Sequence, residues 1–474
     1  MRDQGLWIKD ELKRDSEKFN ISQDFWSPVQ ITQANQQPTN PSTRTDHAPV
    51  FPTGHILPFV LVVVLFFIWG MSNNLTDILV QQFRKGFNLS QLQAQMVQSA
   101  VFTGYFCMAL PAAMLMRRWG YKAGILAGLC IFGTGTLLFW PAAVIGQYTP
   151  FLIALFVVGC GSATLETAAN PFIAQFGAAE TSEQRLNFAQ AFNPPGTITG
   201  VLVGTYFIFS GVELPASKVA QMKAAGTYAA YLHTEIMRVV PTYVVLGIVV
   251  LLWALLIGIT RFPPMATEAA NGGERGSFRE LARYPHLWFA VIAQFFYVGA
   301  QVTTWSAFIP YVKQYTTFSE RGAGWFLTGN LILIALGRFV STGLMRWFRP
   351  SRMMAVYAVV NIGLVGFGMA HPGVTGAIAI MVTSFFMSIM FPTIFALGVK
   401  GLGANTKLGG ALIVMAIVGG AAFPPLLGAI ARSTGSLAHG YIVVAVAYLA
   451  VVIYGFAQGR DVSLASVDRV PETF

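Results

Sequence analysis

The sequence predicts an all-α integral membrane protein with twelve transmembrane helices, six in each half of the chain. Of its 474 residues, 54% are hydrophobic and only 11% are charged, and the mean hydropathy is +0.58. Such values are not typical of a soluble protein. The apolar residues also fall into separate runs, each long enough to cross about 30 Å of hydrocarbon.

The twelve runs form two groups of six. The first group covers residues 56–82, 92–116, 121–146, 149–175, 186–210 and 238–261. The second group covers residues 285–312, 321–347, 351–370, 373–399, 408–431 and 438–458. Several runs contain proline, such as the Pro194-Pro195 pair. Transporter helices tolerate proline where they kink or line a cavity, so we expect a kink there.

Polar stretches divide the chain into five expected parts. Residues 1–54 lack an apolar segment behind a basic start, so they are expected to form a disordered cytoplasmic tail and not a signal peptide. Residues 55–262 and 285–459 would be the two helical bundles. A cytoplasmic linker, 263–284, would join them, and residues 460–474 would be a second cytoplasmic tail.

The net charge of +10 is explained by membrane topology. The Lys and Arg residues occupy short loops and form no single basic patch, so nucleic acid is not an expected partner. With a cytoplasmic N-terminus, five inner loops carry thirteen Lys and Arg residues, whereas six outer loops carry eight. Because inner loops favour positive charge, both termini are expected to be cytoplasmic. The protein itself is expected to lie in the lipid bilayer of the cell inner membrane.

An internal repeat relates the two halves. The segment LMRRWGYKAGILAG at 115–128 resembles LMRWFRPSRMMAVYA at 344–358. Each segment closes the second run of its half and places a basic cluster on the turn that follows, where it can cap helix ends. Duplicated halves of this kind are typical of carriers that work by alternating access.

Only two of the twenty acidic residues, Asp77 and Glu166, lie inside the apolar runs. Intramembrane carboxyl groups are costly and usually belong to a proton or substrate pathway. Asn73 lies four residues before Asp77, and Asn170 lies four residues after Glu166. Each pair therefore shares one helix face. These two stripes predict a polar surface that carries titrating acids beside amide groups.

Two further runs carry polar stripes. In the fifth run, Gln190 and Asn193 lie on one side of the helix, although interhelical hydrogen bonding is an alternative role. In the seventh run, the positions i, i+3, i+7 and i+11 are Gln294, Tyr297, Gln301 and Trp305. Amides bind hydroxyl groups and aromatic faces stack on C–H surfaces, but Tyr and Trp also anchor helices at membrane interfaces.

Several longer strings resemble a known family. They are NNLTDIL at 73–79, LETAANPF at 165–172, RLNFAQAFN at 185–193, PTIFALGVKGLG at 392–403 and TKLGGALIVM at 406–415. These strings are similar to the L-fucose:proton symporter group of the major facilitator superfamily. The resemblance covers essentially everything after the N-terminal tail. It implies two six-helix bundles around a central cavity, and import of L-fucose or a related hexose by proton symport.

The resemblance also implies roles for individual residues. Asp77 and Glu166 match the two proton-coupling acids, with Asp77 expected as the principal protonation site and Glu166 as the acid that couples sugar binding to protonation. With the residues chosen by spacing, the expected substrate-binding set is Asn73, Glu166, Asn170, Gln190, Asn193, Gln294, Tyr297, Gln301 and Trp305. The proton would be the coupling ion, no cofactor or metal is expected, and the protein is expected to act as a monomer.

Departures from the family pattern leave alternatives open. Met390-Phe391 stands where the fucose symporter pattern has Gln-Tyr, and Pro310 replaces a basic residue of that pattern. Two polar groups are thereby lost, so glucose, galactose or N-acetylglucosamine is an alternative substrate. A non-transporting sugar sensor is an alternative class, but binding alone would not need two titrating acids. An enzyme is not expected, because the chain has no GxxxxGK[ST] loop and its six histidines have no ligand spacing.

Overall fold

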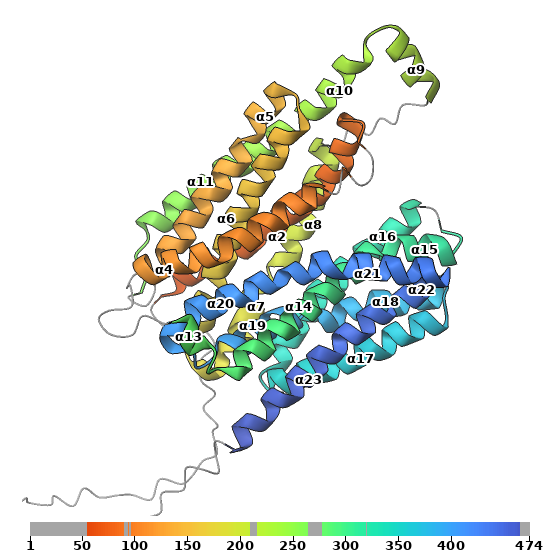
Figure 1. Ribbon diagram of the computed structural model, residues 1–474. Helices are drawn as coiled ribbons and strands as arrows, with labels where there is room; N and C mark the ends of the chain where they lie inside the picture. Colours follow the sequence, from red (N-terminus) through yellow and green to blue (C-terminus); the bar gives the residue numbers. More distant parts are fainter. Residues whose placement is uncertain are drawn as a thin grey trace, which may run out of the picture. The chain divides into compact units, whose positions relative to one another are not determined.

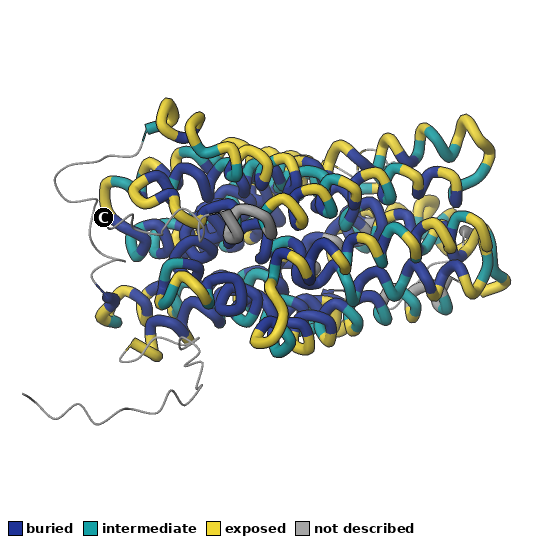
Figure 2. Tube along the Cα trace, turned by 90° about the horizontal axis from the view of Figure 1, so that it is seen from below, coloured by how far each residue is buried: buried dark blue, intermediate teal, exposed yellow. Residues whose placement is uncertain are grey.

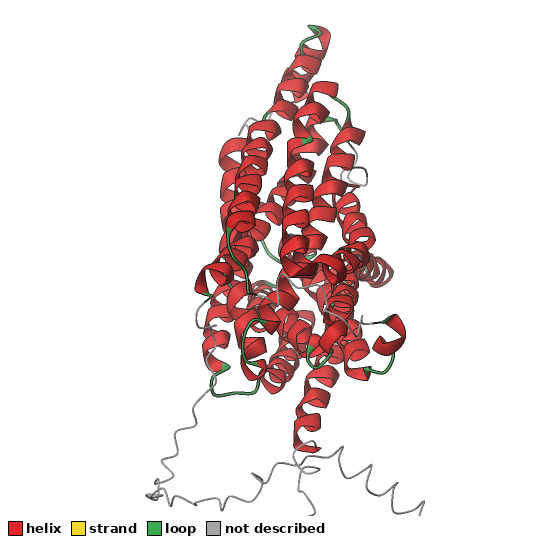
Figure 3. Cartoon of the chain, turned by 90° about the vertical axis from the view of Figure 1, so that its left-hand side faces the viewer, coloured by secondary structure: helices red, strands yellow, loops and turns green. Residues whose placement is uncertain are grey.

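The computed structural model describes residues 55–89, 93, 96–208, 216–263, 277–318 and 320–464, which belong to one compact unit, Ala48–Phe474. The described residues form helices joined by short turns, with no strand among them (Figures 1 and 3). The expected tail at 1–54 lies outside the described residues. So do most of the expected linker and of the second tail.

The helices follow the order of the predicted runs. The first half contains α2 (Ile56–Gly86), α4 (Met96–Leu137), α5 (Phe139–Ile145), α6 (Tyr148–Gln175), α7 (Ser182–Gln190), α8 (Asn193–Val203), a π-helical turn (Gly204–Ile208), α9 (Ala216–Ala224), α10 (Tyr228–Met237) and α11 (Val239–Ile259). The second half contains α13 (Phe278–Leu281), α14 (Pro285–Ser306), α15 (Phe308–Tyr315), α16 (Glu320–Leu344), α17 (Pro350–Ala370), α18 (Val374–Met387), α19 (Met390–Val399), α20 (Thr406–Met415), α21 (Gly419–Thr434), α22 (Leu437–Gly440) and α23 (Ile442–Leu464).

Within the described residues, nine helical stretches are long and apolar enough to cross a membrane. One of them, Met96–Ile145, contains two predicted runs, because two helices meet at Gly120. The φ of Gly120 is 79°, which glycine adopts more readily than other residues. The shorter apolar helix α16 and the interrupted segment from α7 to the π-helical turn correspond to the other two runs. The predicted twelve-helix fold is therefore confirmed.

The outer helix faces are apolar. On α11, Leu252, Leu255 and Ile259 are each at least 60% exposed. This helix has no polar residue between Tyr243 and Ile259. Buried residues gather inside the bundles, and exposed residues mark the outer faces (Figure 2). Leucine and isoleucine side chains exposed in this way are suited to contact lipid tails.

Helices α2 and α8 pack through a spine of small residues. Gly196, Gly200 and Gly204 recur every four residues on one side of α8 and its continuation. A Cβ atom at Gly196 would collide with the Phe67 carbonyl, and one at Gly200 would collide with the Met71 carbonyl. Small residues at this spacing let membrane helices approach closely. The spine therefore fixes α2, the helix whose sequence includes the predicted acid of the first run.

Membrane segments of both halves are interrupted, and two of the interruptions lie just before prolines. The fifth segment breaks between the end of α7 at Gln190 and the start of α8 at Asn193. This break directly precedes the proline pair at which a kink is expected. The tenth segment breaks between the end of α18 at Met387 and the start of α19 at Met390, two residues before Pro392. Each half of the molecule thus has a helix break beside a proline.

We expect Gly196→Ala to lower the melting temperature of the purified protein, because the added methyl group has no space beside the Phe67 carbonyl. Overpacking of this kind costs about 1–3 kcal/mol. Gly366→Ala is the matched control, because Gly366 has nothing within 4 Å of an added Cβ and alanine favours helices. Equal melting temperatures for the two variants would contradict close packing of α2 on α8.

Candidate functional site

Helix α6 holds Glu166 and Asn170 on one buried face, as their spacing predicts. Glu166 is 1% exposed and Asn170 is fully buried. Within the described residues, the two carboxyl oxygens of Glu166 and the Nδ2 atom of Asn170 have no hydrogen-bond partner. Asn170 Oδ1 accepts a hydrogen bond from Gln190 Nε2 at 2.9 Å. The structure therefore brings together three predicted site residues from α6 and α7, with several polar atoms still unused.

Tyr105 is a further member of this site. It lies on α4, and its hydroxyl accepts a hydrogen bond from Trp69 Nε1 on α2 at 2.9 Å. The other polar neighbours of this hydroxyl are Ser162 and Glu166 on α6. Sequence reasoning missed Tyr105, because tyrosine in a membrane helix is commonly an interface anchor. Its position in the middle of the second apolar run, away from both membrane interfaces, could have indicated a site residue.

Two more carboxyl groups are buried, although both lie outside the predicted runs. Glu183 and Glu235 are 3% and 2% exposed. Glu183 Oε1 pairs with Lys400 Nζ at 3.0 Å, and Glu235 Oε2 accepts a hydrogen bond from Gln82 Nε2 at 3.3 Å. A buried charge is tolerated when it is paired. Both carboxyl groups have polar partners, in contrast to Glu166.

The described side chains among the predicted residues on α2 and α8 make no hydrogen bond to Asn170 or Gln190. Asn73 is exposed, and the side chain of Asp77 lies outside what the structure describes. Asn193 is half-buried and its Nδ2 donates to the main-chain carbonyl of Phe66 at 3.2 Å. The amide of Asn193 is thus used in holding α8 against α2. The predicted pairing of Asn73 with Asp77 stays a prediction.

The side chains of the predicted stripe on α14 differ in whether their polar atoms make hydrogen bonds. The Tyr297 hydroxyl donates to the Met387 carbonyl at 3.0 Å, and Trp305 Nε1 donates to Ser384 Oγ at 3.2 Å. Gln301 is half-buried. Gln294 is fully buried, and both atoms of its amide lack a hydrogen-bond partner within the described part of the chain. Of the four, Gln294 is the one whose polar atoms are both buried and unused.

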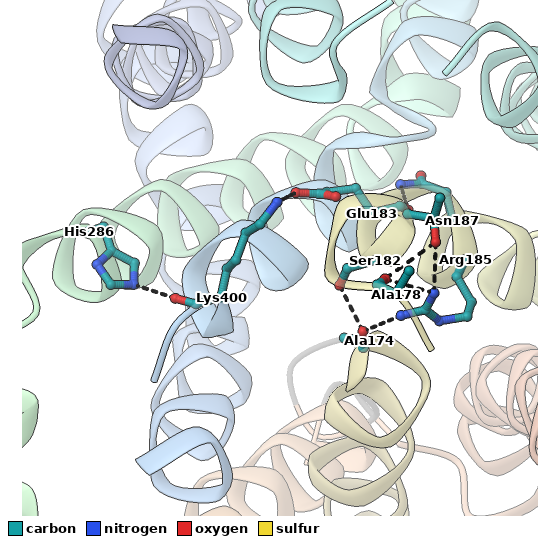
Figure 4. A network of polar contacts seen from close by, with 9 residues as sticks. Ala174, Ala178, Ser182, Glu183, Arg185, Asn187, His286 and Lys400 are labelled. Atoms are coloured by element: carbon teal, nitrogen blue, oxygen red, sulfur yellow. Dashed lines mark hydrogen bonds and ion pairs between the residues drawn. The ribbon is translucent and has the colours of Figure 1, made fainter. Parts of the chain in front are cut away.

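Polar contacts join the two halves at the end of the molecule where α7 begins, which we call the α7 end. They link Glu183 with Lys400 at 3.0 Å, Gln184 Nε2 with the Thr342 carbonyl at 3.0 Å, Asn187 Nδ2 with Thr393 Oγ1 at 3.1 Å, and Lys407 Nζ with the Met116 carbonyl at 2.9 Å. Figure 4 shows Glu183 meeting Lys400, and Arg185 and Ser182 holding the start of α7 to the Ala174 carbonyl at the end of α6. The halves are therefore in contact at the α7 end.

These features define a class of protein. Two helical halves that each contain broken helices, and an unpaired carboxyl group among buried amides, are typical of secondary transporters. The chain belongs to the Major Facilitator Superfamily, whose family model matches residues 59–407. The prediction of a transporter fold is thereby confirmed, and the protein is a transporter and not an enzyme.

Individual relatives are similar over most of the chain. It is 40% identical over 412 residues to the L-fucose-proton symporter of Escherichia coli (strain K12), with 86% of this chain and 94% of that protein covered. It is 32% identical over 436 residues to the glucose/galactose transporter of Brucella abortus, with 90% and 100% covered. The crystal structure of the transporter FucP in the outward conformation matches with a TM-score of 0.79 and 39% identity, covering 85% of this chain and 99% of that one.

Replacing Gln294 and Gln190 should have opposite effects on stability. Gln294→Leu removes two buried, unpartnered polar atoms, each of which costs about 1–3 kcal/mol, so the melting temperature of the purified protein should rise. Gln190→Leu breaks the hydrogen bond to Asn170 and should lower the melting temperature. Thermal unfolding of both variants in one detergent tests this, and a fall for both would contradict an unused amide at Gln294.

Proposed function

We propose that this chain imports L-fucose or a related hexose together with a proton, by alternating access. The observation that carries the proposal is the Glu166 carboxyl group, which is buried without a hydrogen-bond partner in the described residues and lies one helix turn from the unused Nδ2 of Asn170. A bare carboxylate in such surroundings is costly. A bound proton or donated sugar hydroxyls would remove that cost.

The roles of the site residues remain proposals. Asp77 is the principal protonation site, and Glu166 couples sugar binding to protonation. Asn170, Gln190 and Gln294 are the substrate-binding amides best supported by burial. Asn73, Asn193, Tyr297, Gln301 and Trp305 complete the proposed substrate-binding set. Differential affinity for sugar between the two protonation states would couple the two fluxes.

The choice of sugar is supported by relatives. The Escherichia coli relative is an L-fucose-proton symporter and the Brucella relative is a glucose/galactose transporter, so glucose, galactose and N-acetylglucosamine remain alternative substrates. A sugar sensor is disfavoured because it would not need the two acids. We also propose a monomer in the inner membrane, without a cofactor, whose α7 end and termini face the cytoplasm; the excess of Lys and Arg in the inner loops supports this orientation.

Proton movement can be followed in lightly buffered, de-energised cells that express the protein. Adding L-fucose should make the medium more alkaline, because sugar entering down its gradient carries protons with it. Galactose, glucose and N-acetylglucosamine are added separately to rank the substrates. If no sugar changes the pH although the protein is present in the membrane, a different solute, a uniporter or a sensor would replace the proposal.

Substitutions can separate the roles of Asp77 and Glu166. Asp77→Asn should reduce proton-driven accumulation about tenfold or more while leaving exchange of labelled sugar across the membrane, because an amide cannot carry a proton. Glu166→Gln should weaken sugar binding as well. Glu235→Gln is the matched control, since that buried carboxyl group already has a partner in Gln82. Accumulation that still follows the proton gradient in Asp77→Asn would rule out the role given to Asp77.

A further inference from the structure

The breaks before Pro194 and Pro392 each leave a carbonyl group without its usual donor. In a continuous α-helix, the carbonyl of residue i accepts the N–H of residue i+4. Four residues after Gln190 the chain has Pro194, and four residues after Ser388 it has Pro392. Proline has no N–H. The carbonyl groups of Gln190 and Ser388, one in each half of the molecule, therefore need donors from elsewhere.

Arg338 supplies both donors. Its Nη1 donates to the Gln190 carbonyl at 2.6 Å, and its Nε donates to the Ser388 carbonyl at 2.7 Å. Arg338 lies on α16 and is 5% exposed, so it does not extend toward the membrane surface. The guanidinium has five donors in a rigid plane, which suits two acceptors at once. We call these two hydrogen bonds the Arg338 bridge.

The Arg338 bridge also reaches the candidate site. The residue whose carbonyl it binds, Gln190, donates its side-chain amide to Asn170, and Asn170 lies one turn from Glu166 on α6. Ser388 belongs to the same half as Arg338, whereas Gln190 belongs to the other half. If the halves separate at the α7 end, the bond to Ser388 can persist, but the bond to Gln190 must break.

We propose that Arg338 is a positioning residue that ties the site amides on α6 and α7 to the closed arrangement of the α7 end. Separation of the halves frees the Gln190 carbonyl, which Pro194 leaves without a main-chain donor. The series of hydrogen bonds from Arg338 through Gln190 to Asn170 is then broken. The proposal rests on the proposed function only in assigning sugar and proton to these amides and to Glu166. The bridge itself acts whichever solute is carried.

The other contacts between the halves are weaker candidates for this role. The side chain of Lys400 in the ion pair with Glu183 is 45% exposed, and water screens an exposed pair. The bonds of Gln184 and Asn187 involve neutral amides. The Arg338 bridge is charged, buried and made to two carbonyl groups at helix ends, where the helix dipole favours a cation.

The test measures how readily the α7 end opens in the full-length protein, purified and placed in lipid nanodiscs. Cys107, Cys130 and Cys160 are replaced by serine, and Thr342→Cys serves as the reporter. Thr342 is 8% exposed, and its contact with Gln184 uses the main-chain carbonyl, so the substitution preserves that contact. The rate of maleimide alkylation then reports the opening of the halves. The measurement needs no sugar, so its result is independent of the proposed substrate.

Arg338→Gln should raise the alkylation rate of the reporter about tenfold, the size of effect expected for the loss of a buried charge-assisted hydrogen bond. Arg338→Lys keeps the charge but not the two-pronged geometry, so its rate should be more than twofold above that of the parent and below that of Arg338→Gln. Arg346→Gln, at an exposed arginine just beyond the end of α16, is the control and should match the parent. A rate within twofold of the parent for a monodisperse Arg338→Gln or Arg338→Lys protein would overturn the proposal.

A double-variant cycle tests the carbonyl argument itself. Pro194→Ala restores an N–H that can donate to the Gln190 carbonyl and so replace part of the Arg338 bridge. In this background, Arg338→Gln should change the alkylation rate less than it does in the parent. An equal change in both backgrounds would show that Arg338 acts through something other than the Gln190 carbonyl, and would overturn the bridge as described.

Discussion

The structure depends on the requirement that every backbone N–H and C=O group inside a membrane finds a partner within the protein. Continuous helices meet this requirement by themselves. At the breaks before Pro194 and Pro392, Arg338 supplies the missing donors to the carbonyl groups of Gln190 and Ser388. Tyr297 similarly donates to the Met387 carbonyl beside the second break. The breaks in the two halves are thus stabilised by side chains that lie in the interior.

This requirement divides the buried polar residues into two groups. One group donates hydrogen bonds to neighbouring helices and so contributes to helix packing; it includes Tyr297, Trp305 and Asn193. Glu166 and Gln294 have polar atoms without a partner among the described residues. Unused buried polar groups lower stability, and a bound solute or proton would compensate for that loss.

The length and composition of the apolar runs were enough to predict the twelve-helix fold, because crossing the hydrocarbon fixes how many apolar residues a helix needs. Helical spacing likewise placed Glu166 and Asn170 on one face. The burial of Glu183 and Glu235 was not predictable in this way. It depends on which side chains approach from distant segments, namely Lys400 and Gln82. For the same reason the spacing on α14 could not separate Gln294 from its neighbours.

The hydrogen bond between Trp69 and Tyr105 fixes a direction. The indole nitrogen can only donate, so the Tyr105 oxygen must act as the acceptor, and its single proton is available to the α6 side, toward Ser162 or Glu166. A phenol polarised in this way can solvate a carboxylate without admitting water. Helices α2, α4 and α6 are thus linked by donors that all point toward α6, so any proton that the phenol donates is directed to the helix that carries Glu166.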